Sequence, residues 1–347
     1  MTETKGILVK GCLAAVLTVC LICLPAASQA QRPLPQESGF SGYIELLGGV
    51  ISSDSQLNAE GENAKTDSLD GPGRRVGTFR VVPLGLVNYT FAEARTQLYF
   101  GVLPENVAEG QIQIEAGVRH DLTDGTIFRV SAVPITPLAA ETWSDPYVIG
   151  QDRVKTDIDS FGVKFAAENI HNSAFNLKFG WARQEIDNET SGTFLITQPG
   201  SGLTPADLNT LDRDSDFFRL TGEYTFKLTP RMHLKPILKY TRGDAEGGAY
   251  SFHGLMPQLS FQYFGNRFQA AVNAAVSVED YDDTHPVFAK TRRDYNLGLF
   301  AILGYRAPFG LKDFRADWFN GIFKNDSNIN FDESTSLFTF LGFGYVF

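Results

Sequence analysis

Apolar and polar residues alternate along most of this chain with a period of two. The end of the chain shows it most clearly, because one set of alternate positions is mostly apolar and aromatic and consists of Leu337, Thr339, Leu341, Phe343, Tyr345 and Phe347. A period of two indicates a β-strand rather than a helix. A strand this apolar would promote aggregation in water, but it suits a wall with one face against lipid.

Fourteen segments of about 10–15 residues share this alternation and are bounded by turn residues. They lie near 40–51, 78–91, 95–103, 110–120, 125–135, 157–169, 173–187, 214–228, 230–243, 249–264, 267–280, 290–306, 315–325 and 333–347. Short connections such as 92–94 and 170–172 alternate with long ones such as 52–77 and 188–213. Up-and-down barrels alternate tight periplasmic turns with long outer loops, whereas a soluble β-sandwich has no reason to do so. The pattern predicts an all-β, antiparallel up-and-down transmembrane β-barrel over residues 40–347, with fourteen strands, or 12 or 16 as alternatives.

The segment 290–306 indicates which face meets lipid. Its apolar row begins and ends with Tyr295 and Tyr305, and Leu297, Leu299 and Leu303 lie between them. At about 3.3 Å per residue and a tilt near 40°, ten residues span roughly 25 Å of membrane, the height of the apolar band between two aromatic girdles. We therefore predict that Tyr295 and Tyr305 belong to the girdles; a sandwich core strand with two surface tyrosines is the alternative.

The N-terminus has the features of a cleaved Sec signal peptide. Lys5 and Lys10 precede an apolar stretch over 12–24, and a small-x-small site follows at 28–30. A stretch of thirteen residues, apolar except for Thr18, is too short to span a membrane as a helix. We assign residues 1–30 to the signal peptide and 31–39 to a short periplasmic lead. All three cysteines fall in 1–30, so the exported chain would have no thiol chemistry or disulfide.

Composition narrows the class further. Hydrophobic residues make up 43% and charged residues 20%, which excludes a disordered chain and a helical membrane protein. The formal net charge of −10 gives no reason to expect nucleic-acid binding.

The C-terminal residues carry a resemblance to a known class. Leu341, Phe343, Tyr345 and Phe347 resemble the C-terminal signature of Gram-negative outer-membrane proteins. The resemblance implies that the barrel-assembly machinery reads this strand, which then closes the barrel against the first strand. The stretches "SGFSGYIELLGG" and "TQLYFGVLPE" also resemble an uncharacterised family of bacterial porin-like outer-membrane proteins. Neither resemblance implies a catalytic residue.

The polar rows of the predicted strands supply candidate pore-lining residues. Ten are basic: Arg80, Arg95, Arg119, Arg129, Lys164, Lys178, Arg219, Arg231, Lys235 and Lys239. Six acidic residues accompany them: Glu45, Glu115, Glu168, Glu223, Glu279 and Asp294. Arg231, His233, Lys235 and Lys239 share one face of 230–243 and suggest a basic stripe along a water-filled pore. The alternative is internal bracing, with these charges paired to neighbours such as Glu223.

No pattern points to an enzyme or a cofactor. The five histidines have no metal-binding spacing, and no nucleophile or phosphate-loop motif is present. Asp280, Asp282, Asp283 and His285 superficially fit an outer-membrane protease, but acidic outer loops are common on such proteins and a solvated loop is the preferred interpretation.

The best functional hypothesis is passive diffusion of small polar solutes through a porin-like channel that leans toward anions. The alternatives are a substrate-specific transporter and a non-conducting surface adhesin or binding barrel. Transporters of the fatty-acid type carry a long N-terminal plug, whereas only 31–39 precede the first strand here. The expected partners are outer-membrane lipid and lipopolysaccharide, the barrel-assembly machinery and small polar solutes, with a homo-oligomer left open.

Overall fold

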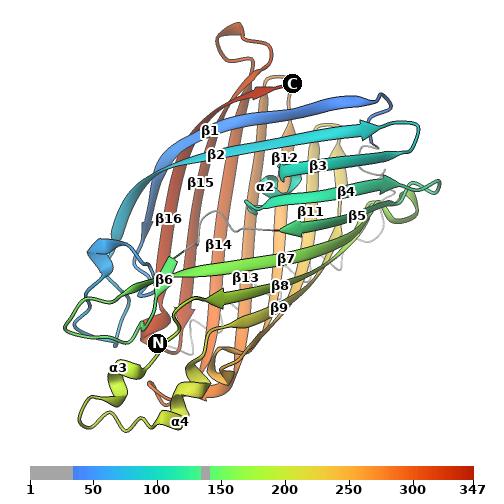
Figure 1. The fold of residues 1–347 in the computed structure, drawn as a ribbon. Coiled ribbons are helices and arrows are strands. Elements are labelled where there is room, and N and C mark those ends of the chain that lie inside the picture. Colours follow the sequence, from blue (N-terminus) through green and yellow to red (C-terminus); the bar gives the residue numbers. More distant parts are fainter. Residues whose placement is uncertain (1–33, 134–140) are drawn as a thin grey trace.

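A closed antiparallel β-barrel dominates the computed structural model, which describes residues 34–133 and 141–347 (Figure 1). The predicted signal peptide and the start of the lead lie outside these residues. The strands are β1 (Gly39–Ser53), β2 (Val76–Phe91), β3 (Thr96–Val102), β4 (Ile114–Asp121), β5 (Ile127–Val133), β6 (Glu141–Trp143), β7 (Lys155–Glu168), β8 (Phe175–Ile186), β9 (Ser215–Tyr224), β10 (Phe226–Thr229), β11 (Met232–Ala245), β12 (Phe252–Phe264), β13 (Phe268–His285), β14 (Lys290–Arg306), β15 (Phe314–Ser327) and β16 (Ser334–Val346).

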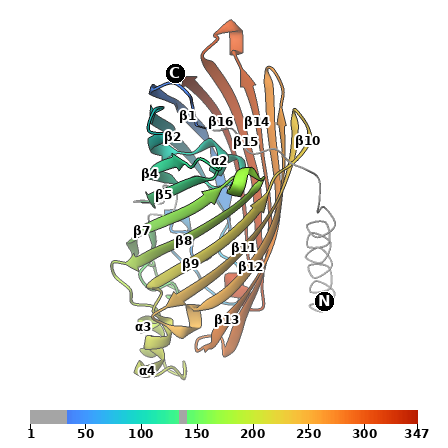
Figure 2. The same cartoon turned by 90° about the vertical axis from the view of Figure 1, so that its right-hand side faces the viewer.

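Each strand of the wall pairs with its neighbour in the chain, and the ring closes where β1 meets β16. β9 and β10 continue one strand across Thr225, and both pair with β11. β6 pairs only with the outer end of β7 and takes no place in the ring. The described residues therefore form fourteen wall strands, which confirms the predicted fold class and strand number. Figure 2 shows β7, β8, β9, β11 and β12 following one another along one side.

The last strand closes the barrel as predicted. Its register against β1 runs from Tyr43 opposite Val346 to Ser53 opposite Ser336. Beyond β16, the Phe347 amide donates to the Gly42 carbonyl at 3.0 Å, and the Gly42 amide donates to the Phe347 carbonyl at 2.8 Å. Pairing therefore continues to the final residue and leaves no frayed edge at the seam.

The two ends of the barrel differ. The start of β1, the C-terminus and the short turns lie at one end, and the long loops lie at the other (Figure 1). The long loops carry α3 (Thr193–Ile196), α4 (Pro205–Leu208) and the 3₁₀ turns η1 (Gly61–Asn63) and η3 (Asn209–Leu211). Shorter connections at the same end carry η4 (Gly248–Tyr250) and η6 (Asn330–Asp332), while η2 (Ile170–Asn172) and η5 (Pro308–Gly310) lie in turns at the other end. No helix in the described residues is long and apolar enough to cross a membrane.

The outer face of the wall is apolar. On β14, Leu297, Leu299 and Leu303 are 55%, 47% and 45% exposed. Aromatic rings gather at the end with the short turns, where Phe268 lies 4.9 Å from Tyr305 and Phe40 lies 4.8 Å from Tyr89 between ring centroids. Exposed leucine at this density costs free energy in water and none in lipid. The predicted lipid-facing row of β14 is therefore confirmed as outward-facing.

The interior departs from the expectation of a uniformly polar lumen. β1, β2, β3, β14, β15 and β16 contribute buried apolar side chains to one cluster inside the ring, which contains Tyr43, Leu47, Val82, Leu84, Leu86, Tyr99, Phe300, Phe319 and Phe340. Both faces of β1 are apolar, since Ile44 and Leu46 face outward between Tyr43 and Leu47. This side of the lumen is a packed core.

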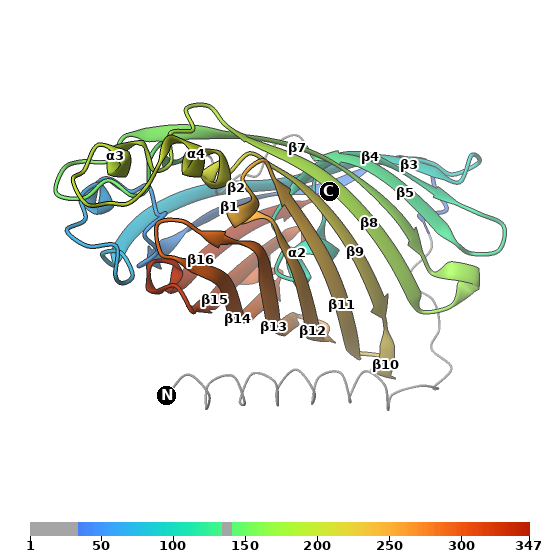
Figure 3. The same cartoon turned by 90° about the horizontal axis from the view of Figure 1, so that it is seen from below.

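A segment between β3 and β4 covers that core. β3 and β4 are short because the chain leaves the wall after Val102 and returns only at Ile114. Residues 103–113, here called the inward segment, carry α2 (Pro104–Ala108), which lies inside the ring of strands in Figure 3. The predicted strand at 110–120 therefore begins four residues late. Pro104 starts a helical turn, and Gly110 adopts a φ of +80°, which breaks a strand.

Candidate pore constriction

The inward segment is anchored on its apolar side by Leu103 and Val107. Both side chains are buried in the apolar cluster formed by β1, β2 and β14–β16. Burying a side chain of this size stabilises its position by about 1.5–3 kcal/mol. Buried ion pairs contribute little net stability, since desolvation offsets their attraction. The apolar contacts therefore fix the segment, and its polar contacts orient it.

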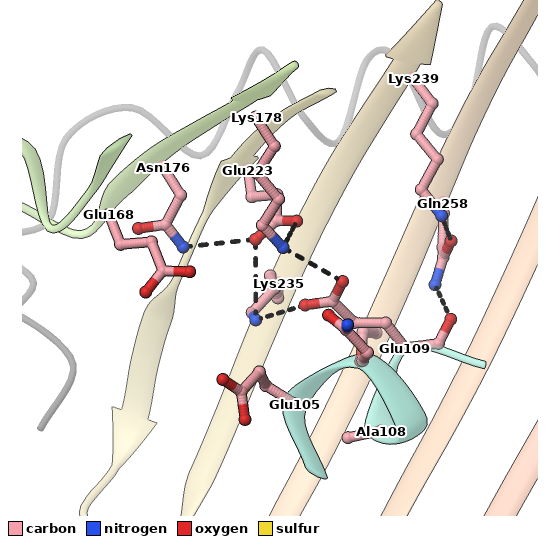
Figure 4. Close-up of polar contacts among 12 residues, drawn as sticks. Glu105, Ala108, Glu109, Glu168, Asn176, Lys178, Glu223, Lys235, Lys239 and Gln258 are labelled. Atoms are coloured by element: carbon pink, nitrogen blue, oxygen red, sulfur yellow. Dashed lines mark hydrogen bonds and ion pairs between the residues drawn. The ribbon is translucent and has the colours of Figure 1, made fainter. Parts of the chain in front are cut away.

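The opposite side of the inward segment reaches the far wall through Glu109. Its Oε1 accepts a hydrogen bond from Lys235 Nζ of β11 at 2.8 Å, and Lys178 Nζ of β8 lies 3.5 Å from Oε2 (Figure 4). The Glu109 backbone carbonyl accepts from Gln258 of β12 at 3.0 Å, and the Ala108 carbonyl accepts from Asn273 of β13 at 2.6 Å. The segment is thus bonded to both sides of the barrel and crosses the lumen between them.

Two more carboxylates tie the inward segment to β4 and β5. Glu115 accepts from Lys164 at 2.6 Å, from Asn106 of α2 at 2.7 Å and from Ser131 at 2.9 Å. Glu105 of α2 pairs with Arg119 and lies 3.7 Å from Arg129.

The remaining carboxylates belong to the wall itself. Arg129 pairs with Glu168 at 2.9 Å. Glu223 pairs with Lys178 and lies 3.9 Å from Lys235. Asn176 adds a hydrogen bond to Glu223 at 3.3 Å.

These contacts form one charge-balanced set, here called the lumen network. It contains the cations Arg119, Arg129, Lys164, Lys178 and Lys235 and the carboxylates Glu105, Glu109, Glu115, Glu168 and Glu223. The strand pattern predicts all five cations in the lumen but neither Glu105 nor Glu109, because both lie in a connection and not on a strand. The one available signal was "LPENVAE", which places proline at the start of a helical turn.

The other predicted pore-lining residues lie outside the network. Arg95 and Arg231 lie in the short turns before β3 and before β11, where Arg95 pairs with Asp121 at 3.1 Å and Arg231 bonds Asn266 at 3.3 Å. Arg80 pairs with Glu60 of the β1–β2 loop. His233 lies near the same end as these turns, with its ring 5.2 Å from that of Phe264. The proposed basic stripe on β11 is therefore reduced to Lys235 and Lys239.

A cavity of about 480 Å³ adjoins the inward segment. Glu109, Gln258 and Asn273 form part of its wall, together with Lys239 and Arg219. Lys239 donates to Gln258 at 2.8 Å, and Arg219 donates to Thr241 at 3.0 Å. Among the described residues, neither cation forms a salt bridge, in contrast to the five cations of the network.

The outer loops meet across the mouth of the barrel. Tyr147, Leu211, Ile329 and Phe331 form a buried apolar cluster, here called the loop bridge. The Tyr147 ring lies 5.3 Å from that of Phe331, and its hydroxyl lies 2.7 Å from His285 Nε2. Tyr147 comes from the β5–β7 loop and Phe331 from the β15–β16 loop, which are half a ring apart. Their contact therefore spans the opening.

The acidic residues predicted in an outer loop lie instead at the outer end of β13, where two of them form ion pairs with other strands. Asp280 pairs with Arg293, and Asp282 pairs with Arg242 at 2.7 Å. His285 bonds to Tyr147, and no carboxylate of residues 34–133 or 141–347 forms a hydrogen bond to it. No cluster of metal-ligating side chains occurs in residues 34–133 or 141–347.

A closed wall with an apolar exterior, aromatic rings at its turn end and charged groups inside defines a transmembrane β-barrel of the outer-membrane type. The chain belongs to the family DUF2860, described as "Protein of unknown function", whose model matches residues 39–346. A search of curated proteins found no match.

Several solved structures show low similarity to this chain. OmpT of Vibrio cholerae is 12% identical with a TM-score of 0.40 and covers 91% of this chain and 100% of its own. OccK5 (OpdH) of Pseudomonas aeruginosa is 12% identical, with a TM-score of 0.38 and coverage of 89% and 98%. OccAB2 of Acinetobacter baumannii is 10% identical, with a TM-score of 0.37 and the same coverage. At this similarity, function has to be argued from the residues of the chain itself.

Proposed function

We propose that this barrel is a passive channel for small polar solutes and that the inward segment narrows the channel. We also propose that the channel conducts anions in preference to cations. The observation that carries the proposal is the lumen network, which lines one side of the interior with charged groups. Fourteen strands leave room for more than side chains, unlike an eight-stranded barrel. Because the apolar cluster fills the other side, the polar side offers a route suited to a hydrated solute.

The charge distribution sets the expected selectivity. Five cations and five carboxylates balance each other in the network, so the network itself attracts neither sign strongly. Within the part of the chain that the structure describes, Lys239 and Arg219 have no salt-bridge partner in the adjoining cavity. Charges that face a narrow, low-dielectric lumen act more strongly on a passing ion than screened charges in the loops. This supports a modest preference for anions.

A planar-bilayer recording tests the proposal. We expect discrete conductance steps from the wild-type barrel and larger steps from a Leu103→Ser, Val107→Ser double variant, because the serines remove the apolar anchor of the inward segment. Leu311→Ser, in the exposed turn between β14 and β15, is a matched control and should leave the conductance unchanged. Absence of steps from both wild type and double variant, with each folded, would rule out a channel.

The loop bridge supports a second candidate, a non-conducting surface barrel that binds through its outer loops. Six outer loops contribute to the bridge and the side chains packed on it, including Leu57, Leu195, Tyr250 and Phe288. Swelling of liposomes that contain the barrel separates the two functions. Solute entry favours the channel, and intact osmotic resistance favours the surface barrel.

A further inference from the structure

The cavity beside the inward segment has a cationic side. Arg219 of β9 lies opposite Thr241 of β11, and Lys239 lies two residues before Thr241, so the two cations occupy adjacent inward positions on neighbouring strands. Lys239 uses one of its three donors on Gln258, and Arg219 uses its Nε on Thr241. The remaining N–H groups can donate to an anion, which would accept charge-assisted hydrogen bonds from both.

The opposite side of the same cavity is aromatic. Phe323 of β15 lines the cavity with 44% of its surface exposed, although it lies on the inner face of the wall. Its ring stacks on Phe338 of β16, with centroids 6.0 Å apart and planes at 22°. Met256 and Phe300 also line the cavity. An exposed aromatic ring in a watery lumen is unfavourable unless an apolar solute covers it.

We propose that this cavity binds small organic monoanions with a flat apolar body, with the carboxylate at Lys239 and Arg219 and the body against Phe323. This inference rests on the proposed channel function and names the class of solute that the channel favours. The cavity falls within the usual range of about 300–1,000 Å³ for small-molecule sites. Glu279 also lines it and repels a second negative charge, so a monoanion fits better than a dianion.

Calorimetric titration of the full barrel, purified from outer membranes in detergent, tests the site. Benzoate is the probe, acetate lacks the apolar body, and benzyl alcohol lacks the charge. Benzoate should bind about tenfold or more tightly than either, because each comparison removes one of the two interactions. Equal binding of benzoate and acetate would overturn the proposal.

Single substitutions test the cationic side and the aromatic side of the site separately. Lys239→Gln and Arg219→Gln should each weaken benzoate binding about tenfold, the usual effect of losing one charge-assisted hydrogen bond. Phe323→Ser should weaken benzoate and leave acetate unchanged. Arg231→Gln removes one positive charge in a distant turn and should not change binding. Heat-modifiable migration in gels confirms that each variant is folded.

The channel function and the anion-binding site can be contradicted independently of each other. A barrel that conducts but binds benzoate no better than acetate would retain the channel function and lose this site. A barrel that does not conduct but binds benzoate with the stated dependence on Lys239 and Phe323 would retain the site and lose the channel function.

Discussion

Glu109 is the residue on which the charge balance of the lumen depends most directly. It is 3% exposed and faces Lys178 and Lys235. Replacing it with Gln preserves its shape and removes one negative charge, so the network gains a net positive charge. We expect reversal potentials in a salt gradient to shift toward stronger anion preference. Glu185→Gln, at an exposed position near the outer rim, should leave the potential unchanged.

An unchanged or cation-shifted potential in Glu109→Gln would contradict this role. It would mean that permeating ions do not pass the inward segment. Stability should also fall, because loss of a carboxylate leaves two buried ammonium groups with fewer partners. A denaturant titration in parallel separates that effect from selectivity.

Leu299 tests the orientation of β14 in the membrane. The residue faces outward near the middle of the strand. Leu299→Arg should reduce the free energy of unfolding by roughly 2–4 kcal/mol, the cost of a cation at the bilayer midplane. Asn296→Arg places the same side chain on the inner face near Asp294 and should cost less. Urea titrations of barrels refolded in lipid measure both, and the reverse order would show that the faces are exchanged.

At the scale of elements, the final strand determines whether the wall can close. Phe347 exchanges two backbone hydrogen bonds with Gly42. Deleting it exposes unpaired backbone groups at the seam, which lipid cannot satisfy. We expect the deletion to reduce the heat-modifiable barrel in outer-membrane fractions strongly and to leave unfolded chain in the periplasm. Wild-type amounts of folded barrel would contradict the prediction.

The elements differ in how far the sequence predicts them. All fourteen wall strands follow from a period of two, because each strand has one face against lipid and is bounded by turn residues. The inward segment could not be predicted, since leaving the wall after Val102 depends on contacts with distant strands. The apolar inner cluster was missed for a related reason. On β1, Tyr43 and Leu47 face inward and Ile44 and Leu46 face outward. Because both faces of this strand are apolar, alternation does not indicate which face meets lipid and which meets the interior.

The candidate site was predicted in part for the same reason. Side chains on strands, such as Lys178, Lys235 and Glu223, could be assigned to the lumen from their position in the alternation. Their partners Glu105 and Glu109 lie in a connection, which has no alternating pattern from which to predict whether a side chain faces the lumen. Without these two carboxylates, basic residues outnumbered acidic ones in the predicted lumen and suggested a basic stripe on β11, whereas Lys235 of that stripe pairs with Glu109.

For the whole molecule, the loop bridge determines how open the outer mouth is. Tyr147 contacts Tyr250, His285 and Phe331, which come from different parts of the ring. Tyr147→Ala should remove the ring that joins these loops, so channels should spend more time open in bilayer recordings. Phe309→Ala, which removes a ring in an exposed turn at the other end, serves as the control. A variant with wild-type open time would place the bridge outside the conduction path.

The contact between Glu109 and Lys235 joins residues 126 positions apart in the chain. Closing so long a stretch of chain costs entropy that only a nearly complete wall can offset, because β8, β11, β12 and β13 must already stand side by side. The inward segment therefore docks late in folding. Until then the growing barrel encloses a wide, water-accessible interior, and the narrow interior of the mature protein is the product of its last folding step.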